Sequence, residues 1–396
     1  MKQEIKERIE LINKGIVPAG YKKTSVGICP VEWEENTLKN IFIFKNGLNK
    51  EKSAFGKGTP IINYTDVWGK RGLKLKDVKG KVTLNKNEIE NYSAKKGDVF
   101  FTRTSETINE IGLTSVLLED IKDCVFSGFV LRGRPIYNQY CYSLDFMRNE
   151  ITKKSSYTTR ALTNGELLSQ VLINLPTKSE QQKIAEILDC ATRQVELQEQ
   201  LVDKLKVQKK ALMQKLLTPQ PDWQEVKLGD ICEDIYQPQT VPQKEFKNNG
   251  YKVYGANGFI GFYDKYNHKE WQVVLSCRGD CGTINKTEPE SWINGNAMVL
   301  KMEGNELIDK NYFYYQCLAT SFKDVIDNSG IPQITRTPLL KKNFRFIKNM
   351  KVQKKIANFF INIDKLIELK QKLLEQYKLR QKALMQLLLT GIVRVN

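Results

Sequence analysis

The chain contains two long segments that repeat each other without a gap, and neither segment contains glycine or proline. Residues 181–218 and 353–390 align at a constant offset of 172, with 16 of 38 positions identical. Both segments are rich in Lys, Gln, Leu and Glu, which favour helix. Apolar residues alternate at spacings of four and three, beginning at Ile184 and at Ile356. This spacing is typical of a coiled-coil seam, so the sequence predicts two long helices.

The duplication extends to the start of each repeated unit, well before its long segment. Three apolar residues recur at the same spacing, each set after a proline-containing stretch: Trp33, Leu38 and Ile41, then Trp223, Leu228 and Ile231. Two segments, residues 20–176 before the first long helix and residues 219–350 between the two, mix short β-like runs with Gly, Asn and Asp turns, and do not resemble each other closely. Each of these two segments is expected to fold as an α+β domain.

The N-terminus resembles the end of the second repeat. Leu11-x3-Gly15-Ile16-Val17 matches Leu387-x3-Gly391-Ile392-Val393, so a short N-terminal helix is expected beside the end of the second long helix. The predicted organisation has five parts: an N-terminal helical segment at 1–19, a first domain at 20–176, a central long helix at 177–218, a second domain at 219–350, and a C-terminal long helix and tail at 351–396.

A pseudo-two-fold relation between the repeats requires the two long helices to run antiparallel. Facing residues of an antiparallel pair have a constant sum of residue numbers, and we expect the polar interruptions of the two seams to face each other. Gln198 opposite Gln381 sets this sum at 579, which also places Lys209 opposite Lys370 and Leu205 opposite Leu374.

Charge and hydropathy narrow the class of protein. The chain has 62 Lys and Arg against 45 Asp and Glu, a net charge of +17, which points to a nucleic-acid partner. On charge alone, an ordinary basic protein remains the alternative. No apolar run approaches the roughly 18 residues of a membrane span, and the first residues lack a signal-peptide core. A cytoplasmic protein that does not enter a membrane is therefore expected.

Metal sites are not expected. The eight cysteines include no CxxC pair. The closest two are Cys277 and Cys281, and with His268 they do not supply the four ligands in paired spacing that structural zinc requires. Reduced cysteines that pack in the interior are the expected state.

Catalytic residues are not expected either. The chain has no Pro-Pro pair and so lacks the motif with which adenine methyltransferases grip a flipped base, and it has no P-loop. One nuclease-like pattern combines Asp222 with Glu245 and Lys247, but Asp222 lies at a linker and the first half has no counterpart. A charged, solvated linker is the simpler interpretation.

The order of motifs resembles the specificity (S) subunits of type I restriction-modification systems. The resemblance rests on Leu175-Pro176, on Glu180–Asp189, on Lys210–Thr218 and on the C-terminal copy of these motifs. Segments of the two domains are also similar to family motifs: Gly97–Ser105 in the first, and Tyr254–Gly258 with Gly279-x2-Gly282-Thr283 in the second. One departure is Lys348–Gln353, which replaces the usual proline and glutamate and is expected to loosen the start of the second helix.

The resemblance implies a fold and a set of partners. Two globular target-recognition domains would each read one half of a bipartite site in double-stranded DNA, separated by a coiled-coil spacer of two antiparallel helices. The chain would bind two modification (methyltransferase) subunits, and restriction (endonuclease and translocase) subunits would join that core. The chain itself would have no catalytic residue, no metal and no cofactor, because S-adenosylmethionine, ATP and Mg would belong to the partners. A self-contained nuclease or methyltransferase with an unrecognised site is the alternative function, and a purely structural coiled coil is disfavoured by the size of the domains.

Bases are read in the grooves mainly by Arg, Lys, Asn and Gln, while hydroxyl groups hold phosphates. For each candidate the alternative is a solvated surface charge or a turn residue. Loop 102–108 is the strongest cluster, because an arginine and hydroxyl residues follow a predicted strand that ends at Thr102. The DNA-contact candidates of the first domain are Asn63, Tyr64, Lys70, Arg71, Arg103, Thr104, Ser105 and Arg160, and those of the second are Tyr254, Asn257, His268, Arg278, Asn285, Lys286 and Arg336.

Overall fold

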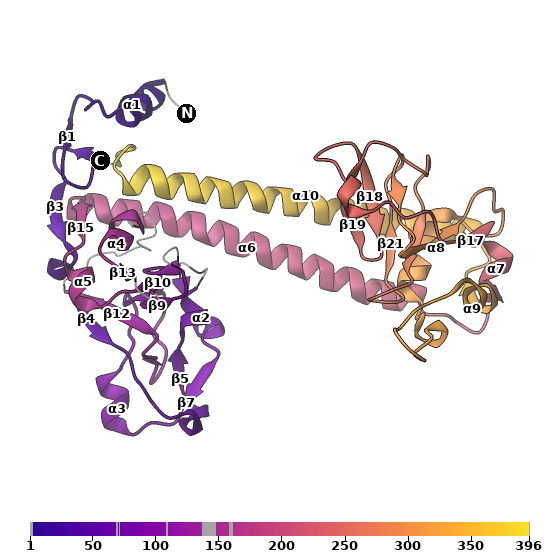
Figure 1. Ribbon diagram of the computed structural model, residues 1–396, viewed down its shortest axis with the longest axis horizontal. Coiled ribbons are helices and arrows are strands. Elements are labelled where there is room, and N and C mark those ends of the chain that lie inside the picture. Colours follow the sequence, from indigo (N-terminus) through magenta and orange to yellow (C-terminus); the bar gives the residue numbers. More distant parts are fainter. Residues whose placement is uncertain are drawn as a thin grey trace. The chain divides into compact units, whose positions relative to one another are not determined.

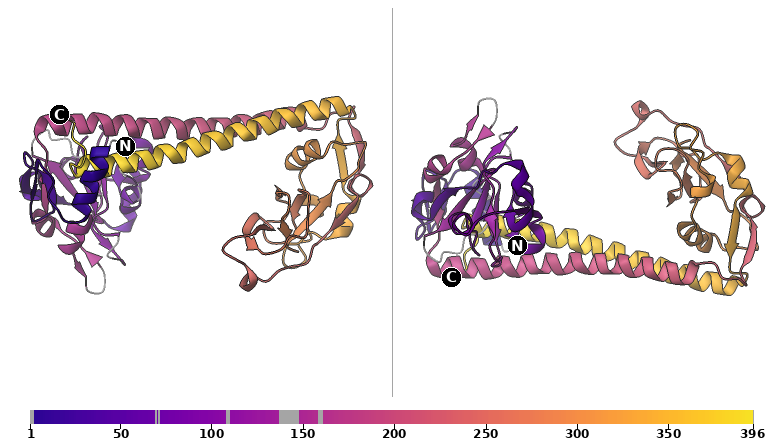
Figure 2. Two further views of the ribbon diagram at one scale, coloured as in Figure 1. Left: turned by 90° about the horizontal axis from the view of Figure 1, so that it is seen from above. Right: turned by 90° about the horizontal axis from the view of Figure 1, so that it is seen from below.

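In the computed structural model, the chain divides into two compact units (Figure 1). Unit 1 consists of residues 1–196 and 375–396, and unit 2 of residues 197–374. The structure describes residues 3–68, 70, 72–107, 110–136, 148–157 and 161–395. Helices α6 (Lys178–Leu217) and α10 (Met350–Leu389) are each continuous over 40 residues and contribute to both units (Figure 2). No helix in the described ranges is long and apolar enough to cross a membrane.

Unit 1 is built on a five-stranded sheet with apolar residues on both faces. The central strand β8 (Val99–Thr102) is fully buried, and its side chains alternate between two cores. Val99 and Phe101 belong to one core and Phe100 to the other. The strand order is β4 (Phe42–Asn46), β12 (Val130–Pro135), β8, β10 (Thr114–Leu117) and β6 (Gly72–Leu73), and a second sheet holds β11 (Val125–Phe126), β5 (Phe55–Ile62) and β7 (Gly80–Val82).

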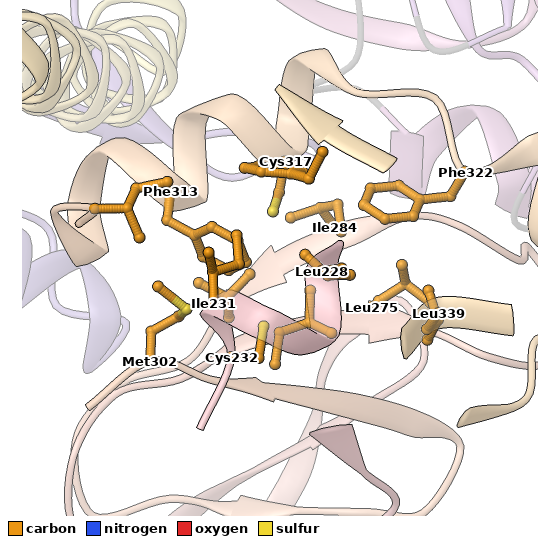
Figure 3. Close-up of a cluster of buried hydrophobic side chains, with 14 of the residues drawn as sticks. Leu228, Ile231, Cys232, Leu275, Ile284, Met302, Phe313, Cys317, Phe322 and Leu339 are labelled. Atoms are coloured by element: carbon orange, nitrogen blue, oxygen red, sulfur yellow. The ribbon is translucent and has the colours of Figure 1, made fainter. Parts of the chain in front are cut away.

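Unit 2 repeats this design with different residues. Its central strand β20 (Val273–Ser276) is also fully buried, with Val273 and Leu275 in the main core and Val274 in a smaller one. Figure 3 shows Leu275 in the main core among side chains from several elements, including Phe313. The strand order is β17 (Asp234–Tyr236), β23 (Ala297–Lys301), β20 and β21 (Ile284–Lys286), and the second sheet holds β19 (Gly258–Tyr263), β18 (Tyr251–Gly255) and β22 (Trp292–Ile293).

The two α+β domains therefore share one topology. The order β4-β12-β8-β10 corresponds to β17-β23-β20-β21, and every neighbouring pair in both sets is antiparallel. In the second sheets, β5 pairs parallel to β11 and antiparallel to β7, just as β18 pairs with β22 and β19. The sequences of the two segments do not show this correspondence, so the duplication extends further than the sequence indicates.

A matched pair of strands leads into each long helix. β3 (Glu34–Thr37) pairs antiparallel with β15 (Leu172–Leu175), and β16 (Gln224–Lys227) pairs in the same way with β24 (Asn343–Phe346). The repeated leucines then bond to the residue before the partner strand: Leu38 N donates to Val171 O at 2.9 Å, and Leu228 N donates to Lys342 O at 2.8 Å. The repeated Trp, Leu and Ile residues therefore lie near the start of each domain, next to the strand that pairs with the domain's last strand.

The starts of the two helices are fixed by equivalent glutamines. Gln181 Nε2 donates to Pro176 O at 2.8 Å, and Gln353 Nε2 donates to Ile347 O at 2.6 Å. Helix α10 begins at Met350, which corresponds to Lys178 of α6 at the repeat offset of 172. Asn349 Oδ1 caps α10 by accepting from Lys351 N at 3.0 Å, in place of the usual proline and glutamate.

The long helices pack antiparallel within each unit, but the predicted register is wrong. In unit 1, Gln381 Nε2 donates to Thr192 Oγ1 at 2.8 Å. In unit 2, Gln198 Nε2 donates to Lys370 O at 2.9 Å, and Lys209 pairs with Asp364. Gln198, Lys209 and Gln381 each find a complementary group on the other helix, whereas the predicted register would place Lys209 against Lys370.

Helix α1 (Gln3–Asn13) lies beside the end of α10, as expected from the sequence match. Arg8 Nη1 donates to Ile392 O and Tyr21 OH donates to Gly391 O, both at 2.7 Å. Gly15 and Gly391 have φ angles of +73° and +71°, the left-handed conformation in which glycine commonly ends a helix. The remaining elements are β1 (Tyr21–Lys23), β2 (Ile28–Pro30), α2 (Tyr64–Val67), α3 (Lys86–Asn91), β9 (Thr104–Ser105), α4 (Arg148–Lys153), β13 (Ser156–Tyr157), β14 (Ala161–Leu162), α5 (Gly165–Ser169), α7 (Leu228–Ile231), α8 (Lys310–Ala319) and α9 (Arg336–Lys341).

Candidate DNA interface

The central strand of each domain ends in a loop that is closed in the same way. Thr102 N donates to Leu113 O at 2.9 Å, and Gly112 N donates to Thr102 O at 3.0 Å. In the second domain, Ser276 N donates to Thr283 O at 2.8 Å, and Gly282 N donates to Ser276 O at 2.9 Å. The first recognition loop (103–111, without residues 108 and 109) and the second recognition loop (277–281) therefore occupy equivalent places in the shared topology.

In the first domain, two candidates meet at an acidic residue that the sequence analysis did not select. Ser105 Oγ donates to Glu110 Oε2 at 2.6 Å, and Tyr64 OH donates to the same oxygen at 3.3 Å. Thr104 lies in β9, which pairs with β14. Glu110 thus holds the first recognition loop together. A carboxylate is not a residue that one would choose for a DNA surface, so nothing in the sequence pointed to it.

Arg103 lines an open cavity of about 510 Å³ together with Phe44, Asn46 and Asn164. Its Nη1 donates a long hydrogen bond of 3.4 Å to Gly128 O, and its Nε is buried without a partner in the described residues. An unsatisfied guanidinium nitrogen is costly. Arg103 is half-buried and lines this open cavity, so among the described candidates of this domain it is one that a ligand could reach.

The other candidates of the first domain are used within the fold or are not described. Asn63 precedes α2, and its backbone N donates to Asp66 Oδ2 at 2.9 Å. Lys70 Nζ forms an ion pair of 2.9 Å with Asp77. Arg71 and Arg160 lie outside the described residues.

In the second domain, one candidate lies in the second recognition loop and two lie at the β18–β19 turn. Arg278 is exposed in the loop, and Asn257 is exposed in the turn. Asn285 Nδ2 donates to Ala256 O at 3.4 Å, so this residue supports the turn that presents Asn257.

Three other candidates of this domain use their polar atoms internally. Tyr254 is 7% exposed, and its OH accepts from Glu288 N at 3.2 Å. His268 is buried between Tyr236 OH at 2.8 Å and Asn267 Oδ1 at 2.6 Å, and burial lowers its pKa to about 4, so the ring is neutral at pH 7. Arg336 Nε donates to Ile235 O at 2.6 Å, and Nη2 lies 3.0 Å from Asp234 Oδ1.

Lys286 differs from these three because its ammonium group lies over an aromatic ring. Its Nζ is 3.9 Å from the centre of the Trp271 ring and donates to Asn311 Oδ1 at 3.1 Å.

Cys277 and Cys281, the closest cysteines in sequence, contact different groups, Gly295 O and Pro332 O. Within the described ranges, no three His, Cys, Asp or Glu side chains are grouped so that they could hold a metal ion.

Known proteins share the sequence pattern and the fold. The family model described as "Type I restriction modification DNA specificity domain" matches residues 30–207 and 220–379. The putative type I restriction enzyme MjaX specificity subunit of Methanocaldococcus jannaschii is 26% identical over 419 aligned positions, covering 95% of this chain and 97% of the relative. The MjaVIII specificity subunit of the same organism is also 26% identical, over 64% of this chain and 70% of its own length.

Two solved structures resemble the fold at 16% sequence identity. The S subunit of a type I restriction-modification system from M. genitalium gives a TM-score of 0.60, with 90% of this chain and 96% of that chain covered. A chain from a study of complex assembly and conformational transition of the type I R-M system gives a TM-score of 0.54, with 92% and 99% covered.

Proposed function

The chain belongs to the family of type I restriction-modification specificity subunits, and on that premise we propose that it reads a bipartite sequence in double-stranded DNA, with one half-site for each α+β domain. The observation that carries the proposal is the pair of recognition loops. Both follow the central strand of the same sheet topology and are closed by the same hydrogen bonds, but their sequences differ. Two equivalent loops with different side chains suit two half-sites of different sequence.

The side chains offered for base contact are the more accessible candidates of these loops and of the β18–β19 turn. Arg103 of the first domain, which lines an open cavity, and Arg278 and Asn257 of the second, which are exposed, carry the donor groups that pair with base edges in the major groove. Tyr64, Thr104, Ser105 and Asn285 support the loops and turns, while Asn63, Lys70, Tyr254, His268 and Arg336 maintain the domains. The net charge of +17 supplies the attraction to phosphates that does not depend on sequence.

The long helices are proposed as the spacer and as the docking site for two copies of a modification subunit. At 40 residues each, they are about 60 Å long. Exposed apolar residues recur on them at the repeat offset of 172: Leu197 (58% exposed) with Leu369 (63%), and Val207 (68%) with Leu379 (67%). Exposed apolar side chains on a helix favour contact with another protein, and a duplicated pattern suits two identical partners.

Catalysis is assigned to the partners in this proposal. Restriction subunits would join the complex of this chain with two modification subunits, S-adenosylmethionine, ATP and Mg would bind to the partners, and the complex would act in the cytoplasm. Family membership does not favour the alternative of a self-contained nuclease or methyltransferase.

One experiment separates the two functions. The purified chain is incubated with DNA and either S-adenosylmethionine or Mg²⁺, and then with the co-expressed modification subunits added. We expect neither methylation nor cleavage by the chain alone, and methylation once the modification subunits are present. Methylation or cleavage by the chain alone would favour the alternative.

A further inference from the structure

Two lysines of unit 2 lie over the same tryptophan ring. Lys286, on the edge strand β21, has its Nζ 3.9 Å from the centre of the Trp271 ring. Lys310, the first residue of α8, has its Nζ 4.5 Å from the same centre. Both distances are within the range of cation–π attraction. The ring thus holds two positive charges close to each other.

The acidic residues whose charges act on this pair are Asp309 and Asp364 for Lys286, and Glu303 and Glu270 for Lys310. Glu303 accepts a hydrogen bond from Gln272 Nε2 at 3.3 Å. Asp309 caps α8, because its Oδ1 accepts from Asn311 N at 3.0 Å and from Tyr312 N at 2.9 Å. Asp364 pairs with Lys209 and accepts from Tyr315 OH at 2.7 Å. In the part of the chain that the structure describes, neither Lys286 nor Lys310 has a carboxylate oxygen within 4.0 Å.

Lys209 and Lys342 of this unit also lie over aromatic rings, and each of them is paired with an acid. Lys342 Nζ lies 2.6 Å and 2.7 Å from the two oxygens of Asp324, although it also lies over an aromatic ring, that of Phe322. The lysine pair on Trp271 is therefore not explained by an aromatic contact alone. Partial burial, and then the charge of Lys310, lower the pKa of Lys286, so the pair would gain from an added anion.

We propose that Lys286 and Lys310 form a phosphate-binding pair that holds the DNA backbone at the edge of the second domain. The proposal rests on the proposed DNA-binding function and assigns a role to Lys310, which the sequence did not single out. Trp271 and Asn311 act as positioning residues, because they hold the ammonium group of Lys286. Phosphate contacts fix register and orientation and carry no sequence information.

The test measures how DNA affinity depends on salt. The full chain, in complex with its modification subunits, is titrated with a random-sequence duplex between 50 and 200 mM salt. Each lost phosphate contact reduces the slope of log K against log salt by about 0.9, so K286Q/K310Q should lower it by about 1.8. The charge-preserving variant K286R/K310R should keep the slope close to wild type.

The matched control is K342Q, which removes a lysine with an aromatic contact and a carboxylate partner. It should leave the slope unchanged. Circular dichroism of each variant identifies a folding defect. If only K286Q/K310Q fails to fold, the DNA affinities of K286R/K310R and W271L are compared instead. Loss of the Trp271 support should then reduce affinity while the arginine variant retains it.

The outcomes separate this inference from the proposed function. If the wild-type complex bound DNA and K286Q/K310Q kept its full slope, the phosphate pair would be refuted while DNA binding stood. If K286Q/K310Q instead lost its modification subunits with an unchanged slope, the pair would belong to a protein interface and the inference would fall. A wild-type complex without salt-dependent DNA binding would refute the proposed function itself.

Discussion

Lys209 of α6 forms an ion pair with Asp364 of α10, and the side chain of Lys209 is only 19% exposed. The other oxygen of Asp364 accepts a hydrogen bond from Tyr315 OH on α8 at 2.7 Å, so one carboxylate joins three helices of unit 2. Removing this partly buried carboxylate would break both bonds, and Lys209 and Tyr315 would each be left without this partner.

Replacing Asp364 by alanine should therefore destabilise unit 2 by about 1–2 kcal/mol. Thermal unfolding followed by circular dichroism measures the effect, which for a unit of this size corresponds to a shift of roughly 2–8 °C. The control is Glu368→Ala on the same helix, because Glu368 pairs with Lys372 on the surface, where both side chains are more than 60% exposed. Equal effects of the two substitutions would show that Asp364 has no special role.

A buried carboxylate, that of Glu180, fixes the C-terminal tail to unit 1. The side chain of Glu180 is 3% exposed and accepts from Trp33 Nε1 at 2.8 Å and from Arg394 Nε at 2.7 Å. Removing one partner of a buried pair leaves the other charge uncompensated, so Glu180→Ala and Arg394→Ala should each cost about 3 kcal/mol. In a double-mutant cycle measured by denaturant unfolding, the double variant should cost much less than the sum of the single variants. Strict additivity would contradict a direct interaction.

Stability should fall at acidic pH because of His268. Burial lowers the pKa of its ring from 6.5 to about 4, so the unfolded chain binds a proton more readily than the folded chain between these values. The folded state should lose up to about 3 kcal/mol as pH falls from 6.5 to 4. The loss should be smaller in His268→Gln, which cannot be protonated. An identical pH dependence of unfolding in both proteins would exclude His268 as the cause.

The long helices were predictable from the sequence, whereas the topology of the domains was not. Forty residues without Gly or Pro and a regular apolar spacing leave little alternative to a helix. The strands of the domains are mostly two to six residues long, and Val99–Thr102 and Val273–Ser276 occupy equivalent places with different residues. Such short apolar runs identify a buried strand but not its neighbours.

The register failed for a different reason. The prediction paired Gln198 with Gln381, but Gln198 Nε2 bonds to a backbone carbonyl, that of Lys370. A pattern of side chains in the sequence does not indicate which backbone groups they bond to. The same limit applies to the candidate site, where Tyr254 and Arg336 were chosen for their chemistry but are used by backbone groups of their own domain.

The duplicated surface on the long helices predicts the composition of the complex. Native mass spectrometry of the co-expressed complex should show two modification subunits for each chain. Leu197→Glu with Val207→Glu should weaken partner binding, because these exposed side chains lie on the proposed docking face. The matched pair Leu369→Glu with Leu379→Glu should give a similar effect. A stable one-to-one complex at saturating partner would contradict the duplicated docking surface.

The most direct test of the central claim is methylome sequencing of cells that carry the intact system. The wild-type chain should yield a motif of two short sequences separated by unspecified bases. When residues 219–350 are exchanged for the matching segment of a relative, one half of the motif should change and the other should stay the same. A simultaneous change in both halves, or a single continuous motif, would contradict the reading of one half-site by each domain.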